Sequence, residues 1–170
     1  MSIDLTTWPC GPPPSTGQKQ QYPGRFEFNL RKTYSDYLDN ALHMFSGAID
    51  WGTTTDMRPE TGADVVAPYE SIPLPDNSFS AVLADPPYNK GFSNEWTTHA
   101  KDLPKPKRIL KEAIRLVCPG GLVFILHVIV IPAYKIYPCD RIALHPVLAG
   151  PNNAIRVLNV FRKTVTVGND

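Results

Sequence analysis

The chain has few cysteines, little net charge and no long apolar run, and each shortage excludes a class of protein. Cys10, Cys118 and Cys139 are odd in number and far apart, which argues against a disulfide framework or a metal site and predicts a reducing, cytoplasmic setting. The formal net charge of +1 predicts that any contact with nucleic acid comes from local patches. The longest apolar run, Leu122 to Pro132, is interrupted by His127 and is too short to cross a bilayer. Without a signal-peptide pattern at the start, we expect no membrane partner.

Proline, in contrast, is abundant, with 18 in 170 residues. Residues 1–24 hold five of these prolines and several glycines, which predicts an irregular Pro-rich arm. The arm either folds back over a ligand or is a flexible tail. Residues 25–170 have the length and composition of one globular domain.

The sequence pattern in the first part of that domain predicts a helix followed by four short strands. From Arg25 to Leu38 the apolar residues are spaced for one helical face. The strands are predicted at residues 41–45, 53–56, 63–67 and 79–84. Little chain is left between them, so we expect connections reduced to loops or single turns.

The second part has a clearer pattern. An apolar face at helical spacing predicts a helix from Lys101 to Val117, and Pro119-Gly-Gly121 is expected to stop it. Leu122 to Leu126 reads as a fully buried strand. Residues 142–148 and 154–161 flank a turn and predict a closing hairpin.

Asp85, Pro86, Pro87 and Tyr88 stand where the strand at residues 79–84 ends. Neither proline can donate to a sheet, so the strand stops and presents a carboxylate, two rigid residues and an aromatic ring together. In open α/β sheets this carboxyl end is where ligands bind. The four residues are therefore candidates for catalysis.

This tetrapeptide resembles the D/N/S-P-P-Y/F/W motif of the amino-methyltransferases, which move a methyl group from S-adenosylmethionine to an exocyclic amine. The order of elements between residues 40 and 164 is similar to the class I S-adenosylmethionine-dependent methyltransferases, whose sheet ends in a strand hairpin. The resemblance implies an α/β, single-domain Rossmann-like sheet with shortened helices. It also implies S-adenosylmethionine as the cofactor and no metal.

Cofactor-binding positions follow from the same resemblance. Phe45, Ser46 and Gly47 fit the opening of the family's glycine-rich loop, and Asp56 falls on the acid that bridges the ribose hydroxyls. Two positions depart from the pattern. Ile49 stands near the second loop glycine, and Pro68 replaces the acid that binds the adenine amino group, so Glu70 or the backbone near Ile72 is expected to serve there.

The expected partner is DNA, with RNA as the alternative. Basic residues cluster after the tetrapeptide and could meet phosphates, or could form a solvated helix face. Trp96 could stack on a base or pack in the core. The candidate contacts are Lys90, Trp96, Lys105 and Arg108.

The sequence thus favours methyl transfer to a base amine, adenine N6 in DNA before cytosine N4. Three alternatives stay open: an RNA adenine, a protein side-chain amide, or a module that binds S-adenosylmethionine or nucleic acid without catalysis. No separate recognition region is visible, which leaves room for a homo-oligomer or a recognition partner.

Overall fold

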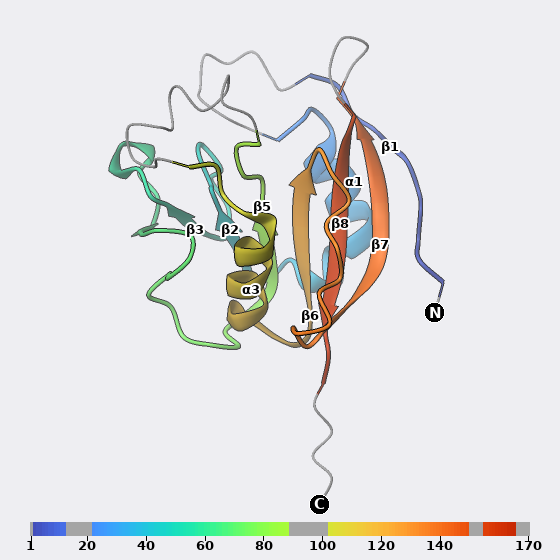
Figure 1. The fold of residues 1–170 in the computed structure, drawn as a ribbon. Coiled ribbons are helices and arrows are strands. Elements are labelled where there is room, and N and C mark those ends of the chain that lie inside the picture. The colour runs from blue at the N-terminus through green and yellow to red at the C-terminus, as the bar shows by residue number, and fades with distance from the viewer. Residues whose placement is uncertain (1, 13–21, 89–101, 150–154, 166–170) are drawn as a thin grey trace, which may run out of the picture.

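The structure, a computed structural model, describes residues 2–12, 22–88, 102–149 and 155–165. Its centre is an eight-stranded sheet with the order β1-β7-β8-β6-β5-β2-β3-β4 (Figure 1). The strands are β1 (Trp8–Pro9), β2 (Ala41–Met44), β3 (Thr53–Asp56), β4 (Val65–Val66), β5 (Phe79–Ala84), β6 (Val117–His127), β7 (Cys139–Leu148) and β8 (Arg156–Lys163). All neighbouring pairs are parallel except the two made by β8. The α/β sheet and its closing hairpin are confirmed.

Four helical segments accompany the sheet in the described residues: α1 (Phe26–Tyr34), η1 (Ser35–Tyr37), η2 (Pro59–Thr61) and α3 (Pro106–Leu116). α3 covers one face of the sheet and α1 the other (Figure 1). Between β2 and β5 the connections are loops and one short turn of 3-10 helix, as the closely spaced strands predict. None of the described helices is long and apolar enough to cross a membrane.

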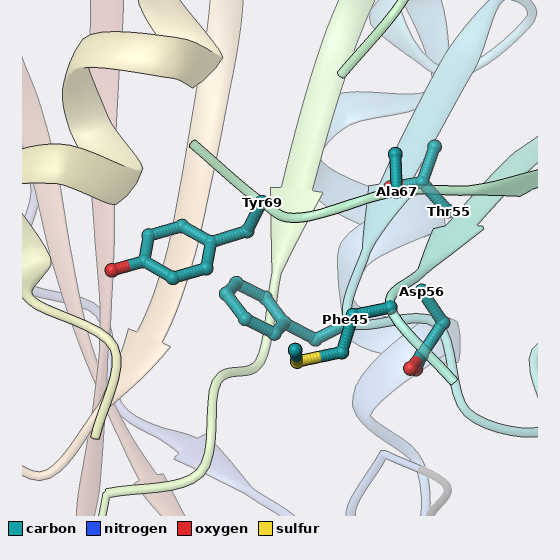
Figure 2. A pocket seen from close by; sticks show the side chains of 6 residues that line it. Phe45, Thr55, Asp56, Ala67 and Tyr69 are labelled. Carbon is teal, nitrogen blue, oxygen red and sulfur yellow. The ribbon is translucent and has the colours of Figure 1, made fainter. Parts of the chain in front are cut away.

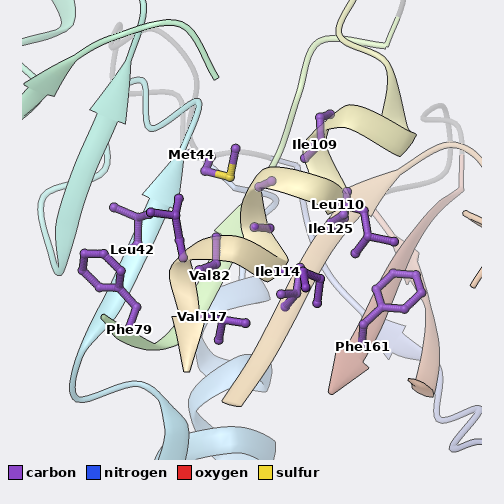
Figure 3. Packing of buried hydrophobic residues seen from close by; sticks show 14 of the residues in the cluster. Leu42, Met44, Phe79, Val82, Ile109, Leu110, Ile114, Val117, Ile125 and Phe161 are labelled. Atoms are coloured by element: carbon purple, nitrogen blue, oxygen red, sulfur yellow. The ribbon is translucent and has the colours of Figure 1, made fainter. Parts of the chain in front are cut away.

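Two apolar clusters fill the space between the sheet and its helices. On the α3 side, residues such as Leu42, Val82, Ile114 and Phe161 pack together (Figure 3). On the α1 side the cluster includes Trp8, Phe26, Leu30, Leu83 and Phe124. Neighbours along β5 alternate between the clusters because successive strand residues face opposite ways. Burial on both faces explains why this strand is apolar at every position except Ser80.

The helix predicted for Lys101–Val117 is shorter at its start, since it begins at Pro106, where proline suits the first helical position. It ends at Leu116, before Pro119-Gly-Gly121. Those three residues instead lie inside β6, where the pairing with β5 shifts register. A Cβ at Gly121 would lie 2.7 Å from the Ser80 carbonyl oxygen. The glycine therefore permits a close strand contact and does not stop the helix.

The arm before residue 25 contains a strand that the sequence pattern did not predict. Trp8 and Pro9 pair in parallel with Val147 and Leu148, so β1 extends the sheet beyond β7. Trp8 is buried and its ring stacks on that of His145, with 4.6 Å between the centroids. The described part of the arm thus belongs to the body of the sheet.

Candidate active site

The candidate site lies where β5, β2, β3 and β4 end. These four strands are parallel neighbours, so the residues that follow them gather along one edge of the sheet. Asp85 comes directly after β5, and Phe45 directly after β2. Asp56 closes β3, and Ala67 follows β4. The sequence motifs that were far apart in the chain are therefore brought to one edge.

Asp85 is a buried carboxylate held by a cation. Arg156, the first residue of β8, places one guanidinium nitrogen 3.2 Å and 3.5 Å from the two carboxylate oxygens. Burial raises the pKa of Asp85 to about 6, against the opposing effect of Arg156. With a pKa below 7, the carboxylate is mainly ionised at neutral pH. Asp85 can therefore act as a hydrogen-bond acceptor at neutral pH.

The rest of the tetrapeptide is packed around this carboxylate. Pro86 and Pro87 are buried, and Tyr88 is partly exposed. The Arg156 guanidinium carbon lies 5.7 Å from the centroid of the Tyr88 ring, within range of a cation–π contact. On β6, the His127 ring lies 5.9 Å from the Tyr88 ring. The aromatic ring is thus positioned by contacts from two strands.

Tyr22 supports the site from the arm side. It is buried, and its hydroxyl lies 3.1 Å from Nδ1 of His43 on β2. Burial raises the pKa of Tyr22 well above its usual value, and the nearby charge of Asp85 adds to that effect. Sequence reasoning missed the contributions of Tyr22 and Arg156, although Tyr22 lies in the arm that was one candidate to fold back over a ligand.

The loop after β2 has the tight geometry expected at a cofactor loop. Phe45 and Gly47 both have left-handed backbones, with φ of 58° and 55°. The amide of Gly47 donates to the Asp56 carboxylate at 3.2 Å. The Ser46 hydroxyl is buried and has no hydrogen-bond partner among the described residues. A buried hydroxyl of this kind is suited to a ligand's polar group.

Asp56 is buried and already paired. Its two oxygens accept from the Arg58 guanidinium at 3.0 Å and 3.1 Å, and one also accepts from the Arg58 backbone amide. This two-point contact is a strong form of ion pair. Any ligand hydroxyl that binds Asp56 must therefore share the carboxylate with Arg58 or displace its side chain.

A small hollow lies between these loops, and its enclosed space is about 10 Å³, room for about one water molecule. A larger ligand would therefore rest against the residues that line it. The Phe45 and Tyr69 rings form one side, with centroids 5.2 Å apart (Figure 2). The lining residues are Phe45, Thr55, Asp56, Met57, Ala67 and Tyr69.

The residues expected to contact adenine are engaged elsewhere in the structure. Ile72 is buried, its amide donates to Glu112, and its carbonyl accepts from Arg115, so α3 occupies both backbone groups. Glu70 does not line the hollow; its carboxylate pairs with Arg108 at 2.9 Å and 3.0 Å. Tyr69 and Ala67 take the places next to the hollow instead.

The expected nucleic-acid contacts are only partly described. Lys105 and Arg108 lie at the start of α3, and Arg108 is exposed and paired with Glu70. The Lys105 amide donates to the Tyr69 hydroxyl at 3.2 Å, which ties the helix start to the hollow. Lys90 and Trp96 lie outside the described residues.

The sequence matches no protein-family model and no curated protein, but the fold is similar to that of solved structures. TrmN from Thermus thermophilus aligns over 85% of this chain with 15% identity and a TM-score of 0.57. N-methyltransferase NodS from Bradyrhizobium japonicum WM9 aligns over 83% of this chain and 95% of its own, with 11% identity and a TM-score of 0.56. The chain spans only 50% of the TrmN structure.

The same fold is found in an enzyme that is named for a different reaction. The [4+2]-cyclase SpnF aligns over 96% of this chain and 88% of its own, with 14% identity and a TM-score of 0.52. At such identities the likeness establishes the Rossmann-like methyltransferase fold and leaves the reaction to the chemistry of the site.

Proposed function

We propose that this chain transfers a methyl group from S-adenosylmethionine to an exocyclic amine of a nucleic-acid base, with adenine N6 in DNA as the first target. The observation that carries the proposal is Asp85, a buried carboxylate between rigid Pro86 and the end of β5, on the same sheet edge as the hollow. NodS, named as an N-methyltransferase and also solved with S-adenosyl-L-homocysteine, adds support from the fold.

The residues around the hollow fit part of the cofactor. The Phe45 and Tyr69 rings offer flat apolar surfaces for an adenine. The Asp56 carboxylate can accept hydrogen bonds from two hydroxyl groups at once, provided that the Arg58 side chain moves away from it. The buried Ser46 hydroxyl supplies a further polar contact. The positive sulfonium of bound S-adenosylmethionine would make its methyl group electrophilic.

The tetrapeptide supplies what the target amine needs. The lone pair of such an amine is delocalised into the base, so the nitrogen is a poor nucleophile. The Asp85 carboxylate and the Pro86 carbonyl can each accept one of its hydrogens and favour a more tetrahedral nitrogen. The ionised Asp85 can then take up the proton that leaves, and the Tyr88 ring offers a face for the base. A base within a duplex must be flipped out to reach these residues.

A second candidate function is a module that binds S-adenosylmethionine or nucleic acid without transfer. The two-point contact of Arg58 with Asp56 favours it, since that contact occupies the expected ribose-binding oxygens. RNA, whose loops already expose bases, and a protein side-chain amide remain the alternative acceptors.

The test is transfer of labelled methyl from S-adenosylmethionine to duplex DNA, single-stranded DNA and total RNA in parallel. We expect label in DNA, in N6-methyl-2′-deoxyadenosine by nucleoside mass analysis. We expect Asp85→Ala to reduce turnover by at least about 100-fold while cofactor affinity changes little. Unchanged turnover in this variant would contradict the role of Asp85. Cofactor binding without label in any acceptor, including a protein extract, would instead favour the binding module.

A further inference from the structure

Arg156 reaches the site from a strand that is not next to β5. The sheet order places β6 between β8 and β5, and Arg156 begins β8 just beyond the pairing of Val157 with His127 at the end of β6. The long side chain therefore extends across the end of β6 to the Asp85 carboxylate, 3.2 Å away. Only 13% of the Arg156 side chain and 10% of the Asp85 side chain are exposed. The ion pair is thus shielded from solvent, where screening is weak.

The same guanidinium contacts both ends of the tetrapeptide. It bonds Asp85 at the first position and lies 5.7 Å from the Tyr88 ring at the fourth. The two residues in between are prolines, which fix the backbone. One side chain thus sets the distance and direction between the expected amine acceptor and the expected base-stacking ring.

The titratable and charged groups that face Asp85 and Tyr88 include groups from three elements of the described chain. Arg156 approaches from β8, and Tyr22 approaches from the arm before α1. His127, at the end of β6, contacts the neighbouring Tyr88 ring. Burial raises the pKa of Tyr22 and of Tyr88 and lowers the pKa of His127. Both tyrosines and the histidine are then neutral at pH 7, and the guanidinium supplies the positive charge.

We propose that Arg156 is a positioning residue for the methyl transfer. Its guanidinium keeps the Asp85 carboxylate ionised and correctly oriented, and it fixes the Tyr88 ring beside that carboxylate. The proposal rests on the proposed function. A buried carboxylate that loses its cation takes up a proton. A protonated Asp85 would present an O–H donor toward the amine hydrogens, where the reaction needs an acceptor.

The test compares three variants by the pH dependence of kcat and kcat/KM. For the wild type we expect activity to fall below about pH 6, where Asp85 becomes protonated. In Arg156→Gln the midpoint should move up by about one pH unit or more, so that at most about half of the activity remains at pH 7 and more is regained at higher pH. Arg156→Lys keeps the charge and should keep the midpoint near that of the wild type, with a lower kcat from poorer geometry.

Arg162→Gln is the matched control, because Arg162 lies on the same strand and pairs with Leu122 at the far end of the β6–β8 pairing. It should leave the midpoint unchanged. An equal loss of activity at every pH in Arg156→Gln, with an unmoved midpoint, would mean that Arg156 serves folding alone and would overturn the proposal.

A second readout does not depend on activity. The Asp85 carboxyl carbon can be titrated by ¹³C NMR in the wild type and in Arg156→Gln. An upward shift of its midpoint in the variant would support the proposal that Arg156 keeps the Asp85 carboxylate ionised. An unshifted midpoint would overturn that proposal. If the shift is seen but the wild type methylates no acceptor, the proposed reaction fails while the electrostatic role of Arg156 stands.

Discussion

Asp56 and Asp85 are both buried aspartates at strand ends, yet their surroundings differ. Asp56 accepts from two backbone amides and from Nε and Nη2 of the Arg58 guanidinium. Asp85 accepts from one nitrogen of Arg156, and burial raises its pKa to about 6. A carboxylate bonded in this way by its neighbours is suited to holding a fixed geometry, whereas one with a raised pKa is suited to proton exchange.

Replacing Asp56 tests its assignment to the cofactor. We expect Asp56→Asn to raise the Kd for S-adenosylmethionine by about 10-fold or more, because a neutral amide accepts hydroxyl groups less strongly than a carboxylate. Isothermal titration calorimetry measures this directly.

Asp64→Asn is the matched control for this experiment. Asp64 also caps a strand amide, that of Thr54 at 2.8 Å, but it does not line the hollow. Its replacement should leave the Kd unchanged. Equal affinity in wild type and Asp56→Asn would assign Asp56 and Arg58 to the fold alone.

The tetrapeptide at residues 85–88 could be picked out as a candidate site because its four residues are consecutive and follow an apolar strand. Arg156 could not be assigned to the site from the sequence, since its contact with Asp85 spans 71 positions and depends on the register of β8 against β6. The contacts of the Ile72 backbone could not be read from the sequence for a similar reason. The side chains that occupy its backbone groups, Glu112 and Arg115, lie 40 and 43 positions away.

At the scale of elements, α3 is tied to the loop before β5 by a network around Arg115. Its guanidinium contacts Glu112, Asp76 and the carbonyls of Ile72 and Leu74 at 2.6 to 3.0 Å. Glu112 is buried and also accepts from the Ile72 amide. The network fixes the chain that leads from the hollow to β5.

Removing this cation should therefore be costly. We expect Arg115→Ala to lower the free energy of unfolding by about 2 kcal/mol or more, because Glu112 would stay buried without its partner. Arg108→Ala removes an exposed pair on the same helix and should cost less than about 1 kcal/mol. Urea unfolding at constant pH compares the two, and similar losses would contradict a special role for the network.

Periodicity explains which elements could be predicted. α3 and the inner strands carry apolar residues at regular spacing, and each was found near its observed position. β1 has two residues, one of them proline, and its partner lies at the other end of the chain, so no local signal marks it. Pro119-Gly-Gly121 misled the prediction because glycine both ends helices and permits strand bulges.

At the scale of the whole molecule, β1 closes one edge of the sheet. Trp8 is 3% exposed and contacts Phe26, Tyr34 and His145, so the arm joins β7 to α1. The neutral His145 is held on both nitrogens, by the Tyr34 hydroxyl at 2.7 Å and the Thr6 carbonyl at 2.8 Å. The arm thereby contributes to stability across the α1 side of the sheet.

Truncating Trp8 measures that contribution. We expect Trp8→Ala to lower the free energy of unfolding by about 3 kcal/mol, as for other buried tryptophans. Leu5→Ala changes an arm side chain that is 65% exposed and should stay within about 0.5 kcal/mol of the wild type. If both variants unfold at the same denaturant concentration as the wild type, the arm does not stabilise the fold.

The long-range docking of β1 also sets an order of folding. Thr6 and His145 touch across 139 positions, so we expect the arm to dock after β7 has joined the sheet. Until then the edge of β7 presents unpaired backbone groups to other chains. The stage at which most of the sheet is assembled and the arm is still undocked is therefore when we expect this protein to be most prone to aggregation.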